Sequence, residues 1–325
     1  AEGSDVVEGR MNLGVVTLNL PRIALETRGD REAFWALLTE RLATVRDALV
    51  YRVARCKEAV PANAPILYVH GAFGQRLTPD DDVDALFRDG RATVSLGYIG
   101  LYEAAAAFFG GQWEGDPEAK AFTMQILRTL HSHAATWTQH HGYQFSVYAT
   151  PSESLTDRFA RLDKAKFGSV ADITDKDYYT NSFHYDVRKN PTPFEKLDFE
   201  KDYPRYSSGG FIHYCEYPVL QTNPKALEAV WDYAYDRVGY LGTNTPIDRC
   251  YQCGFAGDFT PTARGFACPD CDNTNPRTCD VVKRTCGYLG NPQQRPMVHG
   301  RHVEISSRVK HVAGSTRSVP AREAD

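Results

Sequence analysis

Short apolar runs and longer amphipathic segments alternate along most of the chain. Three β-branched runs, each ended by proline or glycine, predict buried strands at residues 14–20, 91–100 and 143–150. Apolar residues spaced three and four apart predict helices at residues 30–59, 101–109, 117–140 and 154–161. Because strand, turn and helix recur in this order, we expect α/β crossovers in a large sheet or barrel.

The segment 30–59 carries the clearest helical stripe, and Asp30 is its expected N-cap. Six of its apolar positions are expected to face the core: Phe34, Leu38, Leu42, Val45, Leu49 and Val53. Residues 65–70 fit a strand or a loop. A threonine–proline pair then predicts a capped helix over residues 78–87.

The second half of the chain is less regular. Residues 162–208 are polar, aromatic and proline-containing, so we expect mostly a long connection there. A fourth strand is expected within 207–216, and a helix over 223–240 with Gly242 as its C-cap. No linker that would separate domains is evident before residue 243.

Composition places the chain among globular proteins. It has 325 residues, of which 42% are hydrophobic and 24% charged, and a formal net charge of -4. That charge gives no reason to expect a nucleic-acid or membrane surface, and no apolar run approaches the roughly 20 residues of a membrane helix. The first residues lack an initiator methionine and a signal-peptide pattern, so a processed end or a fragment is expected.

Four of the eight cysteines form two Cys-x-x-Cys pairs: Cys250, Cys253, Cys268 and Cys271. This is the spacing of a tetrathiolate zinc ribbon, and four thiolates leave no open position for water. We therefore expect a structural zinc ion and a reducing cytoplasm rather than disulfides. The histidines at 131 and 133 lie on different helix faces, so the His131, His133, His140 and His141 group is not expected to bind metal.

Polar residues next to strand ends are the other candidates for chemistry. Asn19 closes the first apolar run, and Glu153 follows the third just after Pro151. Sheets and barrels place their sites at strand ends, although a helix cap or a strand-end turn explains such residues nearly as often. Gly287 lies between Cys286 and Tyr288 in a segment with little periodicity, which is compatible with a simple turn.

Several stretches together strongly resemble the anaerobic (class III, oxygen-sensitive) ribonucleoside-triphosphate reductases. They are Gly9–Ala24, Tyr148–Glu153, the double Cys-x-x-Cys, Arg284–Gly290 and Arg301–His311, and they cover nearly the whole chain in order. The resemblance implies part of a ten-stranded α/β barrel, built from two antiparallel five-stranded halves, over residues 1–242. Residues 243–325 would form the zinc-binding and glycyl radical domain.

By this resemblance, Gly287 is the residue from which a radical S-adenosylmethionine activase abstracts an α-hydrogen. The radical would pass to a cysteine of a Cys-Arg-Ser-Phe-like motif, whose thiyl radical attacks the ribose of a ribonucleoside triphosphate. That motif is absent between Ala1 and Gly9, and neither Cys56 nor Cys215 matches it. The chain is therefore expected to be the C-terminal half of the enzyme, with an N-terminal half as partner and a homodimer as assembly.

The resemblance also assigns roles around the ribose. Glu153 would accept the proton of the 3′ hydroxyl. Asn19, or less favourably Asn12, would hydrogen-bond the ribose or formate, the expected reductant, with a redoxin-dependent variant as the alternative. Tyr148 would face the loop or the substrate. Two cysteines, Cys279 and Cys286, receive no catalytic role.

Two other functions compete with this interpretation. Another glycyl radical enzyme, such as a pyruvate formate-lyase relative, would carry adjacent catalytic cysteines and usually no zinc ribbon, so the four cysteines argue against it. A non-catalytic zinc-ribbon fragment that receives a radical is the second alternative, because the thiyl cysteine is absent. The coding sequence upstream of Ala1 would show whether a Cys-Arg-Ser-Phe-like motif is present, and so would discriminate between the reductase and the non-catalytic fragment.

Overall fold

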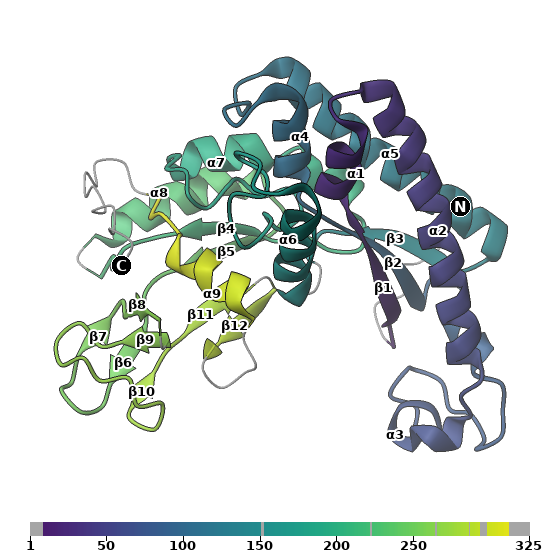
Figure 1. The fold of residues 1–325 in the computed structure, drawn as a ribbon. Helices are drawn as coiled ribbons and strands as arrows, with labels where there is room; N and C mark the ends of the chain where they lie inside the picture. The colour runs from purple at the N-terminus through teal and green to yellow at the C-terminus, as the bar shows by residue number, and fades with distance from the viewer. Residues whose placement is uncertain are drawn as a thin grey trace. The chain divides into compact units, whose positions relative to one another are not determined.

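The computed structural model describes residues 9–150, 153–221, 223–263, 265–285, 287–292 and 298–311. Its contacts divide the chain into two compact units, which are described separately below (Figure 1). The first unit consists of residues 1–184, 202–212 and 299–301. The second consists of residues 185–201, 213–298 and 302–325.

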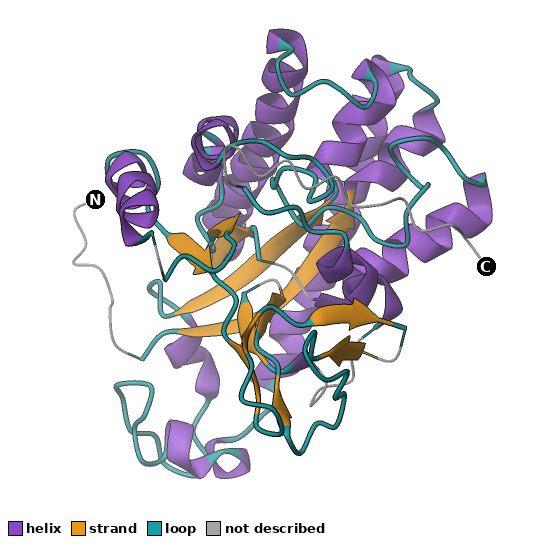
Figure 2. Cartoon of the chain, turned by 90° about the vertical axis from the view of Figure 1, so that its left-hand side faces the viewer, coloured by secondary structure: helices purple, strands orange, loops and turns teal. Residues whose placement is uncertain are grey.

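The first unit is built on a sheet of three parallel strands in the order β1-β2-β3. The strands are β1 (Met11–Asn19), β2 (Ala92–Ile99) and β3 (Gln144–Tyr148). Helices connect them: α1 (Leu20–Thr27), α2 (Arg31–Lys57), α4 (Leu101–Phe109) and α5 (Pro117–His141), while α6 (Glu153–Phe167) follows β3. Long helices lie beside the sheet in both views (Figures 1 and 2). The expected α/β class is thereby confirmed.

Helix α2 follows its sequence signals closely. The Asp30 side chain caps it by accepting a hydrogen bond of 3.0 Å from the backbone N–H of Ala33. All six positions of the expected stripe are buried: Phe34, Leu38, Leu42, Val45, Leu49 and Val53. Local sequence signals were sufficient to predict α2, because the Asp30 cap and the apolar stripe indicate the same helix.

Two short segments of the first unit differ from expectation. Residues 65–70 contain a helical turn, α3 (Pro65–Tyr68), rather than a strand or an extended loop. The helix expected from residue 78 begins later and is a 3₁₀ helix, η2 (Val83–Phe87), capped by Asp82. The backbone N–H of Thr78 donates to the Asp81 side chain at 2.6 Å, so Thr78 is fixed in a turn and does not cap a helix.

The segment 162–208 is more structured than expected. It holds the end of α6, then α7 (Pro193–Glu200) and the 3₁₀ helix η3 (Tyr203–Tyr206). Helix α7 starts with a reciprocal capping box, in which Thr192 accepts from the N–H of Glu195 at 3.2 Å and Glu195 accepts from the N–H of Thr192 at 2.7 Å. The Thr-x-x-Glu spacing of this capping box is a local signal in the sequence, which the expectation of a long connection did not use.

The second unit contains a pair of parallel strands, β4 (His213–Glu216) and β5 (Leu241–Asn244), connected through α8 (Pro224–Tyr235). Helix α8 ends five residues earlier than expected. Gly242 is not its C-cap, because Gly242 lies in β5 opposite Tyr214. The core of this part is apolar and joins α7, α8 and β4 through Leu197, Cys215, Tyr217, Val230 and Ala234.

The cysteine-rich part of the second unit consists of short antiparallel strands. One sheet has the order β10-β6-β7, from Cys279–Asp280, Asp248–Cys250 and Ala256–Gly257. The strands β8 (Thr260–Thr262) and β9 (Gly265–Ala267) form a second pair, and β11 (Lys283–Thr285) and β12 (Tyr288–Gly290) a third. Helix α9 (His299–Ser306) follows.

Within the described ranges these strands form no closed barrel. The structure therefore supports the α/β class and a cysteine-rich β segment, and the complete ten-stranded barrel stays a prediction. In the same ranges, every helix is too short or too polar to span a bilayer.

Candidate functional site

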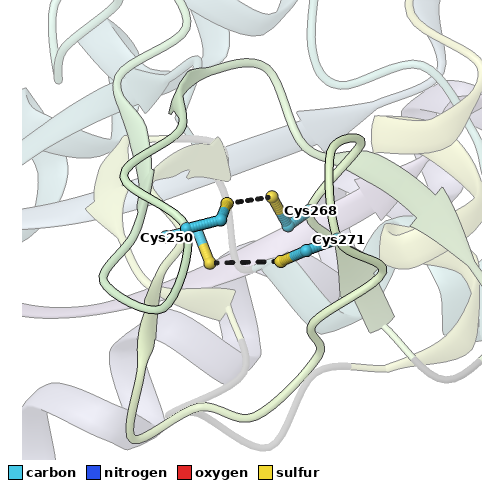
Figure 3. Close-up of side chains that lie close together, drawn as sticks. Cys250, Cys268 and Cys271 are labelled. Atoms are coloured by element: carbon cyan, nitrogen blue, oxygen red, sulfur yellow. Dashed lines mark hydrogen bonds between the residues drawn. The ribbon is translucent and has the colours of Figure 1, made fainter.

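The four cysteines of the two Cys-x-x-Cys pairs converge on one point (Figure 3). All four sulfur atoms lie within 4.8 Å of one another. The Sγ atoms of Cys250 and Cys271 are 3.7 Å apart, and those of Cys253 and Cys268 are 3.5 Å apart. Zinc–sulfur bonds of about 2.3 Å in a tetrahedron place sulfurs about 3.8 Å apart. The cluster therefore has the donor set and the spacing to hold a metal ion such as zinc.

The two Cys-x-x-Cys turns share one backbone design. The carbonyl of Cys250 accepts from the N–H of Gly254, and the carbonyl of Cys268 accepts from the N–H of Asp272, both at 2.9 Å. Gly254 and Asp272 lie in the left-handed region, with φ of 84° and 53°. In both turns the backbone reverses direction just after the second cysteine, so that each turn presents two sulfurs to the common centre.

The surroundings of Cys250 favour its thiolate. Burial opposes ionisation, but the Asn273 side chain and backbone N–H groups of the turn lower the pKa of Cys250 to about 6. The Asn273 Nδ2 lies 3.5 Å from the Cys250 sulfur. A thiolate with N–H donors is the form that binds zinc, so this environment suits a metal ligand.

Cys279 lies near the cluster but behaves as a thiol. It is opposite Cys250 in the β10–β6 pair, and its Sγ donates to the carbonyl of Asn273 at 3.4 Å. Burial, together with the neighbouring Cys250, raises the pKa of Cys279 to about 11. Cys286, the other cysteine near the hairpin, lies outside the described residues.

Gly287 lies in the turn of the β11–β12 hairpin. Thr285 pairs with Tyr288, and Gly287 lies in the turn between them and is exposed. The sequence showed little periodicity here because each strand has only three residues. Tight hairpin turns favour glycine, so Gly287 fits both a turn function and a backbone position that must be approached closely.

The first strand of this hairpin is tied to the cysteine cluster through buried charge. The Nζ of Lys283 donates to Asp248 at 2.6 Å and to Asp258 at 2.7 Å. Asp248 is fully buried and also accepts from the N–H groups of Phe259 and Val282, both at 2.8 Å. Because Asp248 precedes Cys250 by two residues in β6, the hairpin and the cluster share one polar anchor.

Asn19 is both the last residue of β1 and the N-cap of α1. Its Oδ1 accepts from the N–H of Arg22 at 3.1 Å, and its Nδ2 donates to Asp163 at 2.9 Å. Asp163 is fully buried and also accepts from the Tyr179 hydroxyl at 2.8 Å. The structure thus gives Asn19 the capping function that competes with substrate binding, and its contact with ribose stays a prediction.

The other expected ribose residues occupy related positions. Tyr148 is half-buried at the end of β3, opposite Gly97 of β2 and bridged to Gly210. Because β1 and β3 are parallel to β2, Asn19 and Tyr148 lie at the carboxyl edge of one sheet.

Asn12, the alternative to Asn19, lies earlier in β1 and donates to Ser95 at 2.8 Å. Glu153 is the first residue of α6, and its side chain is outside the described part.

Sequence reasoning missed the polar anchors. Asp248 and Asp163 are fully buried and each accepts several hydrogen bonds, but neither was singled out. For Asp248 one signal existed, namely a carboxylate two residues before a Cys-x-x-Cys turn. Its partner Lys283 is 35 positions away, so the pair itself had no local signal.

Comparison with known proteins identifies the family. The family model described as anaerobic ribonucleoside-triphosphate reductase matches residues 2–311. Relatives of that name from Salmonella typhimurium and Escherichia coli are each 53% identical over 311 residues, covering 95% of this chain and 44% of the relative. One from Enterobacteria phage T4 is 46% identical over 313 residues, covering 95% of this chain and 50% of the relative.

Solved structures show the same fold. A structure of an anaerobic ribonucleotide reductase matches with a TM-score of 0.71 at 24% identity, covering 95% of this chain and 46% of the other. The Thermotoga maritima enzyme with MES in its active site matches with a TM-score of 0.66 at 24% identity, covering 90% and 45%. The chain spans about half the length of the relatives it matches. With a family match over nearly all its residues, the chain belongs to the anaerobic ribonucleoside-triphosphate reductase family.

Proposed function

We propose that this chain takes part in the anaerobic reduction of ribonucleoside triphosphates to 2′-deoxyribonucleoside triphosphates by glycyl and thiyl radical chemistry. The family match over residues 2–311 is the observation that carries the proposal. The exposed turn that holds Gly287 and the four-cysteine cluster agree with it. The proposed division is a barrel portion over residues 1–242 and a zinc-binding and glycyl radical domain over 243–325.

The barrel portion would be one five-stranded half of a ten-stranded barrel. Strands β1, β2 and β3 are parallel and adjacent in chain order, and β4 and β5 are likewise parallel. Parallel order within each group is what a half-barrel of five like-directed strands requires. The other half would come from the part of the relatives' length that this chain does not span.

Gly287 would carry the stable radical. Its exposed position in the turn of the β11–β12 hairpin would leave the backbone accessible to an activase of the radical S-adenosylmethionine class. Without a β-carbon, the α-radical can become planar and delocalise over the two flanking amides. Cys250, Cys253, Cys268 and Cys271 would hold a structural zinc ion, whose contribution is to fasten the fold around the hairpin.

The reaction itself would need a thiyl radical from a cysteine outside residues 1–325. That radical would take the 3′ hydrogen of the ribose and return it at the end of the cycle. Glu153 would accept the 3′ hydroxyl proton and later give it back to the same oxygen, while the 2′ hydroxyl takes up one proton from solvent and leaves as water. Formate would supply the two electrons and leave as carbon dioxide. Asn19 and Tyr148, at the carboxyl edge of the β1–β2–β3 sheet, would orient the ribose or formate. A homodimer is the proposed assembly.

The direct test uses the enzyme reconstituted from this chain, the remaining reductase portion and the activase, under strictly anaerobic conditions. The expected result is deoxyribonucleoside triphosphate formed with one carbon dioxide released from labelled formate per product. Product formation with a reduced redoxin and without formate would replace formate by the redoxin. No deoxynucleotide with either reductant would contradict the proposed function.

A further inference from the structure

One arginine links the Gly287 hairpin to the C-terminal segment of the second unit. Arg308 lies two residues after α9 and its side chain is only 11% exposed. Its Nη2 donates to the backbone carbonyl of Arg284 in β11 at 2.7 Å. Its Nη1 donates to Glu216 in β4 at 3.2 Å, and its guanidinium forms two further bonds of 3.0 Å to Glu304.

These contacts belong to a closed ring of hydrogen bonds. The Nε of Arg284 donates to Oδ1 of Asn244 in β5 at 2.8 Å. The Nδ2 of Asn244 donates to Oε1 of Glu216 at 2.6 Å, and the same oxygen accepts from Arg308. Glu216, Asn244, Arg284 and Arg308 thus join four separate segments, and we call them the Arg308 network. All four also line one cleft of the second unit, together with Leu289 of β12.

The backbone on the C-terminal side of Arg308 is itself fixed. The N–H of Val309 donates to the carbonyl of Val187 at 3.0 Å, and the N–H of His311 donates to the carbonyl of Glu216 at 2.7 Å. The N–H of Glu216 in turn donates to Nδ1 of His311 at 2.9 Å. The arginine therefore projects from an anchored segment, which lets it act as a fixed support for β11.

The hairpin cannot hold this position by itself. Its two strands have three residues each, and isolated two-stranded hairpins are marginal in water. We propose that the Arg308 network sets the docked position of the Gly287 hairpin, so that Arg284, Asn244 and Arg308 are positioning residues for the radical glycine. The inference rests on the proposed function for its role in the reaction. The network would hold the hairpin against β4, β5 and the segment after α9 during catalysis. Its hydrogen bonds to β11 must break when Gly287 is presented to the activase.

The first test measures hydrogen exchange in the hairpin amides of the complete chain. In Arg308→Ala, exchange at residues 283–285 and 288–290 is expected to rise by about tenfold or more, because two charge-assisted contacts on β11 and β4 are lost. Arg308→Lys should show the same direction, since an ammonium cannot reproduce the fork of a guanidinium. Arg237→Ala is the control, because Arg237 is exposed in the same unit, and its hydrogen bond and ring contact are with Tyr233 of α8 rather than with the hairpin.

Bound metal is measured in parallel to separate docking from unfolding. Unchanged metal content with faster exchange in the hairpin supports the inference. Wild-type exchange in both Arg308→Lys and Asn244→Ala overturns it. These readouts do not depend on the reaction, so they remain decisive if the reconstituted enzyme forms no radical, a result that would count against the proposed function alone.

The second test separates activation from turnover in the reconstituted enzyme. In Arg308→Lys, the glycyl radical is expected to form at least as fast as in the wild type, while nucleotide reduction per radical falls by about tenfold. A residue with a merely structural role would lower both together, along with bound metal, and that outcome would overturn the inference. Equal turnover per radical in variant and wild type would also overturn it.

Discussion

Arg308 donates a hydrogen bond of 2.7 Å to the carbonyl oxygen of Arg284, three positions before Gly287. The two residues are 24 positions apart, and the bond joins the segment after α9 to the first strand of the hairpin. On its neighbouring residue, Lys283, the same strand is bonded to the fully buried Asp248 beside the cysteine cluster. Successive residues of β11 are therefore held by different parts of the second unit, and the position of Gly287 is set from outside its hairpin.

Loss of one cluster thiol should remove the metal. Cys253 is the exposed member of the cluster, so Cys253→Ser removes one of four ligands without changing a buried side chain. Wild-type protein is expected to bind one zinc ion, and the variant substantially less at the same free zinc concentration. Metal analysis after gel filtration measures this.

Cys279→Ser provides the matched control for that experiment. Cys279 is buried beside the cluster and its sulfur donates to a backbone carbonyl, but it is not one of the four residues whose sulfurs lie within 4.8 Å of one another. It should keep the full zinc content. Equal zinc in Cys253→Ser and the wild type would contradict the assignment of the cluster, as would a loss of zinc in Cys279→Ser alone.

The capping function of Asn19 predicts a cost in stability. Asn19→Ala removes the acceptor for the Arg22 N–H and one donor to the buried Asp163, and should lower the opening free energy of α1 by about 1–3 kcal/mol. Asn19→Ser keeps a cap but cannot reproduce the amide donor, so its cost should be smaller. Native-state hydrogen exchange of α1 amides measures both. Wild-type protection in Asn19→Ala would show that the cap contributes little.

The environment of His311 predicts an acid-sensitive second unit. Burial lowers the pKa of His311 to about 3, aided by the positive charge of Lys196 and, less strongly, of Lys310 and Arg308, against the opposing charge of Glu200. The unfolded chain binds a proton near pH 6.5 and the folded chain does not. Stability from this group is therefore complete above about pH 6.5 and falls toward pH 3, by up to about 1.4 kcal/mol per pH unit.

His311→Asn isolates this effect, because an amide oxygen keeps an acceptor for the Glu216 N–H and does not titrate. Hydrogen exchange of β4 and β5 amides between pH 7 and pH 4, corrected for intrinsic rates, should show a slope smaller by up to one proton in the variant. Identical slopes in variant and wild type would contradict a depressed pKa for His311.

A proton acceptor at Glu153 predicts a split between radical formation and chemistry. Glu153→Gln should leave the glycyl radical intact in the activated enzyme and lower nucleotide reduction by about 10²–10⁴-fold, the usual contribution of a general base. Glu118→Gln is the control, because Glu118 also lies in the first turn of a helix and its side chain is 66% exposed. Full turnover in Glu153→Gln would remove Glu153 from the mechanism.

Local signals explain what could be predicted from sequence. The Asp30 cap and the stripe of α2 lie within one helix, and the four cysteines are brought together by two turns of identical design. The cap and each Cys-x-x-Cys turn are specified by residues a few positions apart, and the two turns are separated by only 15 positions. The α/β order followed from the same kind of pattern.

Other features depend on tertiary structure. The bonds of Arg308 to Glu216 and to Arg284 span 92 and 24 positions, and no local pattern encodes them. Gly242 resembles a helix C-cap, yet pairing with β4 places it in β5 instead. For Asn19 the sequence allowed two functions, and only the three-dimensional contacts with Arg22 and Asp163 show which atoms the fold already uses.

The radical on Gly287 is tested most directly by electron paramagnetic resonance of the anaerobically activated enzyme. A glycyl radical keeps one α-hydrogen, so the wild type should show a doublet at low temperature. Gly115→Ala is the control, because a methyl added at Gly115 meets no atom within 4 Å among the described residues, and this variant should keep the doublet. In Gly287→Ala the account predicts that the doublet is absent, and a doublet that persists in that variant would contradict it.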